Sequence, residues 1–155
     1  MFGFLKSLFG MPKPTGPAQR IATIDSSAKL ISDKASWEDG VLKVNGSSEE
    51  TVRLVELPVA DLEQCMLGLR FQISSANVET GVYPEIWVNV DGFGEAFSKG
   101  LNFRLKGSND WSSCELPFYL KKGQRAKLVK LNVVFEGPGT VSLNHIELYS
   151  TPLAS

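Results

Sequence analysis

Residues 137–150, GPGTVSLNHIELYS, decide the fold of this chain. A Gly-Pro-Gly turn leads into apolar residues that alternate with polar ones, which is the pattern of a β-strand with one buried face. The apolar positions are Val141, Leu143, Ile146 and Leu148. Between the second and third of them stands one extra residue, at Asn144–His145, and one extra residue in a strand is the signature of a β-bulge. The sequence therefore predicts a bulged closing strand, with Asn144–His145 as a structural joint rather than a catalytic site.

The same alternation recurs about every ten to fifteen residues from Ile21 onward, between clusters of Gly, Asn, Asp and Pro, and no window of eleven residues holds a helical stripe. Strands are predicted at residues 40–45, 51–57, 65–74, 85–91, 101–106, 114–120, 128–136 and 140–149. Each of them buries one face only, which is typical of two antiparallel sheets packed on each other. The predicted fold class is all-β: a two-sheet antiparallel jelly-roll β-sandwich with a short N-terminal amphipathic helix.

Alternation also predicts which side chains point into the sandwich. The predicted inward residues are Cys65, Leu67, Leu69, Phe71, Ile73, Ile86, Val88, Val90, Leu101, Phe103, Leu105, Val129, Leu131, Val133 and Phe135.

The composition is that of one globular domain. The chain has 155 residues, 43% hydrophobic and 21% charged, enough for a domain that buries roughly two thirds of its unfolded surface. Sixteen basic and 17 acidic residues give a net charge of -1, without the basic footprint that nucleic acids require, so nucleic-acid binding is disfavoured. Cys65 and Cys114 form no CxxC or Cys/His cluster and are expected to be free buried thiols, as in a reducing compartment.

The first eleven residues, MFGFLKSLFGM, are predicted to form an amphipathic docking segment. On a helical wheel one half carries the apolar side chains Phe2, Phe4, Leu5, Leu8, Phe9 and Met11. So short a helix is marginal in water and orders only against a bilayer surface, a groove on a partner or the protein's own core. Lys6 and Ser7 interrupt the apolar run and Pro12 ends it, so neither a cleaved secretory signal nor a membrane span is predicted. The expected location is cytoplasmic or peripheral to a membrane.

The predicted organisation is a docking segment at 1–11, a Pro-rich linker at 12–19, the sandwich at 20–150 and a tail at 151–155. The linker, PKPTGPAQ, reads as a semi-rigid spacer because proline favours extended backbone.

Residues 110–120, DWSSCELPFYL, and 127–150, KLVKLNVVFEGPGTVSLNHIELYS, resemble the closing strands of galactose-binding-like jelly rolls, the fold of many carbohydrate-binding modules. A looser likeness is to assembly factors of the complex I intermediate-associated type. The resemblance implies that strands one, eight, three and six form one sheet and strands two, seven, four and five the other. Cys65 and Cys114 would then lie at opposite ends of two neighbouring strands, roughly 20 Å apart, too far for a disulfide.

The outward face of the second sheet is a candidate ligand face. Planar amides and guanidinium groups hydrogen-bond sugar hydroxyls, and an aromatic ring gives a platform for an apolar sugar face. Residues on this face are predicted to be Arg53, Trp87, Asn89, Asn102, Arg104, Lys130 and Asn132, with Tyr83, Phe93 and Phe97 in neighbouring loops. The competing interpretation is an ordinary solvated strand face, with Trp87 covering a sheet edge or the N-terminal helix.

Metal and catalytic motifs are not found in the sequence. Asn144–His145 stands where the resembled modules carry an Asp pair, so no bound calcium or other cofactor is expected. One histidine, and no GxSxG, HExxH or P-loop, argue against an enzyme. A carboxylate pair for glycoside hydrolysis remains open, drawn from Glu79, Glu85, Asp91 and Glu136.

The sequence favours two alternative functions. The first is a non-catalytic interaction module whose N-terminal segment docks to a membrane surface or a larger protein assembly. The alternative is a carbohydrate-binding module that uses the polar and aromatic face of one sheet.

Overall fold

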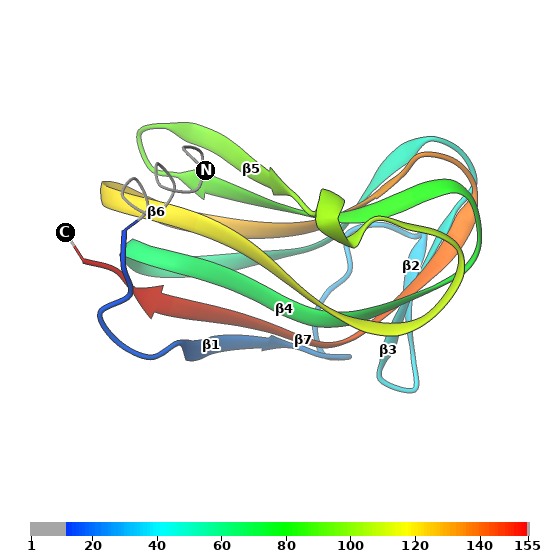
Figure 1. Cartoon of the computed structure of the whole chain (residues 1–155), viewed down its shortest axis with the longest axis horizontal. Coiled ribbons are helices and arrows are strands. Elements are labelled where there is room, and N and C mark those ends of the chain that lie inside the picture. The colour runs from blue at the N-terminus through cyan, green and yellow to red at the C-terminus, as the bar shows by residue number, and fades with distance from the viewer. Residues whose placement is uncertain (1–11, 155) are drawn as a thin grey trace, which may run out of the picture.

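A computed structural model describes residues 12–154, except for the side chains at positions 60 and 61 (Figure 1). Its elements are β1 (Gln19–Ile24), β2 (Ala35–Glu38), β3 (Val41–Gly46), β4 (Glu50–Val90), β5 (Gly94–Lys99), the short 3-10 helix η1 (Leu101–Phe103), β6 (Leu105–Phe135) and β7 (Gly139–Pro152). The docking segment predicted at 1–11 lies outside the described residues. No helix within residues 12–154 is long and apolar enough to cross a bilayer.

Strands β4 and β6 are long and fold back on themselves, so that each contributes to two layers. Sheet I has the order β2, β3, β7, residues 65–76 of β4 and residues 112–120 of β6, with β1 beside the second half of β7. Sheet II has the order 50–58 of β4, 126–135 of β6, 82–90 of β4 and β5. All pairs are antiparallel.

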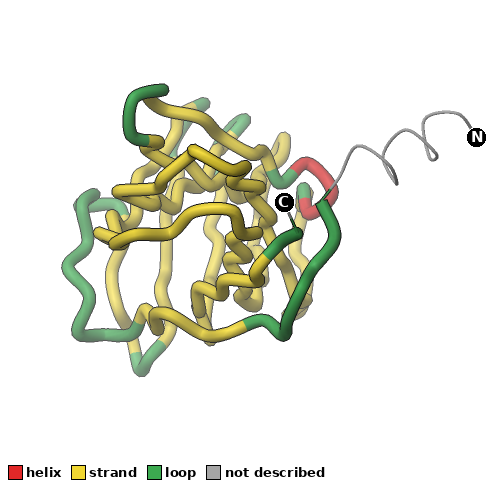
Figure 2. The backbone as a smooth tube through the Cα atoms, turned by 90° about the vertical axis from the view of Figure 1, so that its left-hand side faces the viewer, coloured by secondary structure: helices red, strands yellow, loops and turns green. Residues whose placement is uncertain are grey.

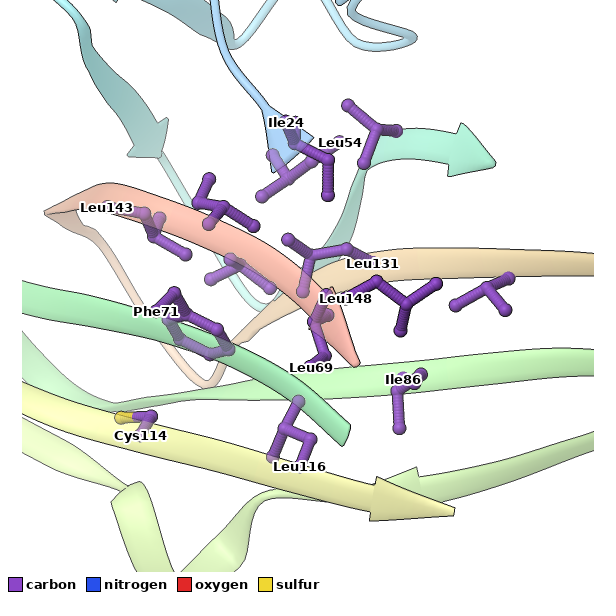
Figure 3. Close-up of a cluster of buried hydrophobic side chains, with 14 of the residues drawn as sticks. Ile24, Leu54, Leu69, Phe71, Ile86, Cys114, Leu116, Leu131, Leu143 and Leu148 are labelled. Carbon is purple, nitrogen blue, oxygen red and sulfur yellow. The ribbon is translucent and has the colours of Figure 1, made fainter. Parts of the chain in front are cut away.

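This arrangement is an all-β jelly-roll sandwich, as predicted. The order of the eight predicted strands is as expected except in the fifth, and β1 and β2, which were not predicted, add to sheet I. The core lies between the sheets and is filled by alternate residues of each strand. Side chains of sheet I, such as Leu69, Phe71 and Leu143, meet Ile86 and Leu131 of sheet II (Figure 3). The predicted inward sets of strands 65–74, 85–91 and 128–136 are all buried.

The predicted strand at 101–106 is wrong. The fifth strand is β5, and residues 101–103 form η1, shown red in Figure 2, in which Leu101 is 56% exposed. The chain leaves the sheet at Gly100, whose N–H donates to Pro84 O at 2.8 Å. A Cβ at Gly100 would lie 2.6 Å from Leu116 Cδ2, so only glycine fits where the chain turns. Phe103 and Leu105 are only partly buried beside the core.

The predicted bulge at Asn144–His145 is confirmed. Gln72 pairs with Asn144 and Arg70 with Glu147, so two residues of β7 face one residue of β4. His145 takes the left-handed conformation, with φ of 50°, and points its exposed side chain away from the core. The alternation therefore slips once, and both halves of β7 keep their apolar residues inward.

The left-handed backbone at His145 predicts a specific mutational pattern. We expect His145→Gly to preserve or raise the free energy of unfolding, by up to about 1 kcal/mol, because glycine adopts this conformation without steric cost. His145→Val should lower it by about 1–2 kcal/mol, since a β-branched residue is strained there. Urea denaturation of the two variants checks this, and equal stability of both would show that the bulge is not held in this geometry.

Candidate functional site

Two rows of side chains cross the outward face of sheet II, and we call them the sheet II face. The strand registers place one row at Arg53, Asn132, Glu85 and Lys99 and the next at Glu56, Lys130, Trp87 and Phe97. These residues alternate with the buried residues of the same strands, so their side chains leave the sheet on the side away from the core. Asn89 lies one position further along the same face, beside Leu128 and Glu95.

The first row is joined by a chain of hydrogen bonds. Arg53 Nε donates to Asn132 Oδ1 at 3.4 Å, and Asn132 Nδ2 donates to Glu85 Oε1 at 3.2 Å. Trp87 Nε1, from the second row, donates to the same Glu85 oxygen at 2.5 Å. Glu85 is 5% exposed and Asn132 1% exposed, although both stand on an outward face. Buried polar groups linked in this way hold their neighbours in fixed positions.

The second row carries an aromatic platform. Trp87 and Phe97 are directly opposite each other on neighbouring strands, with ring centroids 5.1 Å apart and an interplanar angle of 25°. Lys99 Nζ lies 5.7 Å from the Phe97 ring centroid. On the other side of Trp87, Lys130 Nζ pairs with Glu95 Oε1 at 2.6 Å. Because Glu85 already engages the indole N–H and Phe97 stacks on one side of the ring, Trp87 offers a ligand the remaining apolar surface of its ring rather than a donor.

The structure gathers most, but not all, of the predicted ligand residues on this face. Trp87 and Asn89 are partly exposed there, whereas Asn132 is buried and acts through its neighbours. Tyr83 belongs to β4 rather than to a loop and is 8% exposed. Phe93 lies in the turn between β4 and β5. Sequence reasoning placed Phe97 in a loop and Glu85 only among possible catalytic acids, so it missed their contacts with Trp87.

Asn102 and Arg104 do not belong to the sheet II face. They follow β5 in and after η1, because the strand predicted at 101–106 does not form. Arg104 Nε instead donates to Glu136 Oε1 at 2.5 Å, and its NH2 donates to Thr80 O at 2.9 Å. The salt bridge with Glu136 joins the connection after η1 to the residue that follows β6.

A shallow cavity of about 440 Å³ lies on sheet I, where its lining residues include Arg70, Gln72, Glu115 and His145. Arg70 fills much of its polar side, since it pairs with Glu115 and stacks over the Tyr149 ring at 3.9 Å from the centroid. On the same face, a hydrogen bond from Arg20 lowers the pKa of Glu147. Arg53 and Lys130 on the sheet II face are paired in the same way, so what distinguishes that face is the stacked pair Trp87 and Phe97, neither of which lines this cavity.

Both cysteines are free and buried. Cys65 pairs with Leu120 and Cys114 with Phe71, so the two residues stand six positions apart along neighbouring strands, about 20 Å, as expected. Burial raises the pKa of both thiols, that of Cys114 to about 11. A raised pKa keeps the thiols protonated at neutral pH and makes them poor nucleophiles.

Within residues 12–154, no group of three or more His, Cys, Asp or Glu side chains is placed to hold a metal ion. Of the four acids considered for a hydrolytic pair, Glu79 and Glu85 belong to β4, Asp91 lies in the β4–β5 turn and Glu136 follows β6. Glu85 binds Trp87 and Asn132, and Glu136 pairs with Arg104.

Similar solved structures are mainly carbohydrate-binding modules. A family 29 carbohydrate-binding module aligns with a TM-score of 0.55 at 12% identity, over 88% of this chain and 88% of the module. The CBM22-1 xylan-binding domain of Xyn10C from Paenibacillus barcinonensis aligns with a TM-score of 0.52 at 11% identity, over 91% of this chain and 90% of the domain. A Stig cyclase from Fischerella sp. TAU aligns at 0.51 and 15% identity, over 74% of this chain and 64% of the cyclase.

No protein-family model matches the sequence, and no characterised protein sequence is significantly similar to it. The structural similarity therefore shows the fold, which is the jelly roll of carbohydrate-binding modules, as the residues at 110–150 suggested. The looser likeness to complex I assembly factors stays a prediction. Because binding modules and a cyclase share this fold, the function has to be argued from the site.

Proposed function

We propose that the protein is a non-catalytic glycan-binding module and that the sheet II face is its binding surface. The observation that carries the proposal is the chain from Arg53 through Asn132 and Glu85 to Trp87, which holds a guanidinium group and an aromatic ring on one face, with a segment of β6 between their strands. Sugars are recognised by this combination, because the ring packs on C–H groups while planar donors bind the hydroxyls. A binding surface that is fixed in advance loses less entropy when a flexible chain binds.

The charges of the face favour a neutral glycan. Its three cations, Arg53, Lys99 and Lys130, are balanced by Glu56, Glu85 and Glu95. Lys130 and Arg53 already have carboxylates within 2.6 Å and 3.5 Å. A uronate or sulfated chain would have to compete with these carboxylates, whereas neutral hydroxyl groups can share them.

The rows run across four strand segments on an open surface, which suits a linear chain of several sugar units better than an enclosed monosaccharide. Similar family 29 modules have been solved in complex with mannohexaose and with cellulohexaose, and a similar family 22 domain is described as xylan-binding. Neutral β-linked hexasaccharides are therefore the first ligands to test.

Isothermal titration of the full chain with mannohexaose, cellulohexaose and xylohexaose tests the proposal. We expect saturable binding of at least one of them at one site per chain. A polyuronate of the same length is the charge control and should bind more weakly. A folded protein that binds none of the three neutral chains would contradict the proposed function.

The first function considered from the sequence, docking through residues 2–11, concerns residues that are not described and stays a prediction. The glycan proposal does not depend on it, because every residue of the sheet II face belongs to the described part of the chain.

A further inference from the structure

One end of the sandwich, on the left in Figure 1, brings together turns that are distant in sequence, and we call it the hairpin end. Asp91 N, in the β4–β5 turn, donates to Arg125 O at 2.8 Å, beside the turn 121–125 of β6. Glu63 accepts from Gly123 N and from Arg125 Nε, both on that turn. Next along β4, Gln64 O accepts from Leu153 N, and Ala154 N donates to Lys13 O. Residues 91–93, 121–125, 63–64, 12–14 and 153–154 thus form one continuous surface.

Phe93 projects from this end. It is 69% exposed, more than any other large hydrophobic residue within 12–154, and it stands between Gly92 and Gly94, whose φ angles are 79° and 92°. Left-handed glycines on both sides form a tight turn that holds the ring away from the sheet. An exposed phenyl ring at a turn tip has no packing role in the isolated domain.

The charge of the hairpin end is positive. Among the residues that define it are four basic ones, Lys13, Lys121, Lys122 and Arg125, and two acidic ones, Glu63 and Asp91. Glu63 is engaged by Arg125 and Asp91 by Lys127. Lys13, Lys121 and Lys122 are exposed and make no ion pair with any described residue. An exposed aromatic side chain at the same end as these exposed lysines is complementary to a bilayer with anionic headgroups, where the ring enters the interface and the lysines contact phosphates.

We propose that the hairpin end docks to an anionic lipid bilayer, with Phe93 inserted and Lys121 and Lys122 on the headgroups. The sheet II face lies along the side of the sandwich and would remain open to a glycan. This inference is independent of the proposed glycan binding, and either can fail without the other.

Vesicle co-sedimentation of the full chain tests this docking. We expect binding to vesicles of phosphatidylcholine and phosphatidylglycerol at 3:1, little binding to phosphatidylcholine alone, and loss of binding in high salt. The double variant Lys121→Glu with Lys122→Glu should bind at least about 25-fold more weakly, since each lysine near the surface contributes about 5-fold. Phe93→Ser should also bind several-fold more weakly.

Matched controls are available at the opposite end, where Trp111 is 40% exposed and Lys106 is exposed. Trp111→Ser and Lys106→Glu should bind vesicles as the unchanged protein does. Circular dichroism of each variant checks that it is folded, which is expected for surface substitutions. Two results with the unchanged protein would overturn the proposal: no binding to vesicles, or equal binding to both kinds of vesicle. Normal binding by the hairpin-end variants would also overturn it, and would assign docking to residues 2–11 alone.

Discussion

Replacing Phe135 by alanine is expected to lower the free energy of unfolding by about 3–5 kcal/mol, a large part of the stability of a domain of this size. Phe135 ends β6 in sheet II and is completely buried. Its ring lies over Gly46 of β3, in sheet I, so closely that any Cβ at position 46 would collide with it. The side chain therefore fills the space between the two sheets at one end of the sandwich, and its removal leaves a cavity that rigid strands cannot close.

Guanidinium denaturation monitored by tryptophan fluorescence measures this effect. Phe93→Ala removes the same side chain from an exposed turn and should change stability by no more than about 0.5 kcal/mol. Gly46→Ala should also be destabilising, by about 1–3 kcal/mol, because the added methyl group meets the Phe135 ring. If Phe135→Ala lowers the free energy of unfolding by less than about 1 kcal/mol, the ring does not join the two sheets.

Replacing Trp87 by alanine is expected to weaken binding of the neutral hexasaccharide about 10- to 100-fold, because tryptophans at the centre of a binding surface typically contribute 2 kcal/mol or more. The change removes the platform and also leaves Phe97 without its stacking partner. The fold should survive, since Trp87 lies on the outward face and its neighbours Ile86 and Val88 continue to fill the core. Titration calorimetry with the variant gives the affinity ratio directly.

Two further variants test whether the loss of glycan affinity is specific to Trp87 or follows from the loss of any exposed aromatic side chain. Trp111→Ala removes an exposed tryptophan outside the sheet II face and should leave the affinity unchanged. Trp87→Phe keeps a ring but loses the hydrogen bond to Glu85, so it should bind with an intermediate affinity. Equal affinities for Trp87→Ala and the unchanged protein would exclude this face as the glycan site.

Most of the sandwich can be predicted from alternation because most strands bury one clear row of apolar residues. Strand β5 cannot, since it is an edge strand whose inward positions are Ala96 and Ser98 and whose large residue, Phe97, points outward. The most apolar residue of β5 therefore lies on its outward face. Because the residues of η1 are more strongly apolar, the alternation predicted the strand at 101–106 instead. The Asp91–Gly92 pair was the available signal, because Asp-Gly favours a tight hairpin and places a strand directly after it.

The sequence predicts which residues lie on the face of the candidate site, but not the contacts between their side chains. Alternation alone assigns Trp87, Asn89 and Asn132 to an outward face. The hydrogen bonds between strands on this face join residues 35 to 79 positions apart, as in the bond from Arg53 to Asn132. They depend on the register between distant strands, and no local pattern specifies that register. The bulge at His145 could be predicted because it shifts the alternation of apolar residues within a single strand.

The central claim, that the sheet II face binds glycan, is tested most directly by the three indole N–H signals in a ¹H–¹⁵N spectrum. Trp37, Trp87 and Trp111 each contribute one, and they lie in sheet I, on the sheet II face and at the start of the 112–120 segment. Titration with the hexasaccharide should shift the Trp87 indole and the backbone amides of residues 85–99 while the other two indoles stay in place. Shifts confined to Trp37, Trp111 or the cavity around Arg70 and His145 would contradict the account.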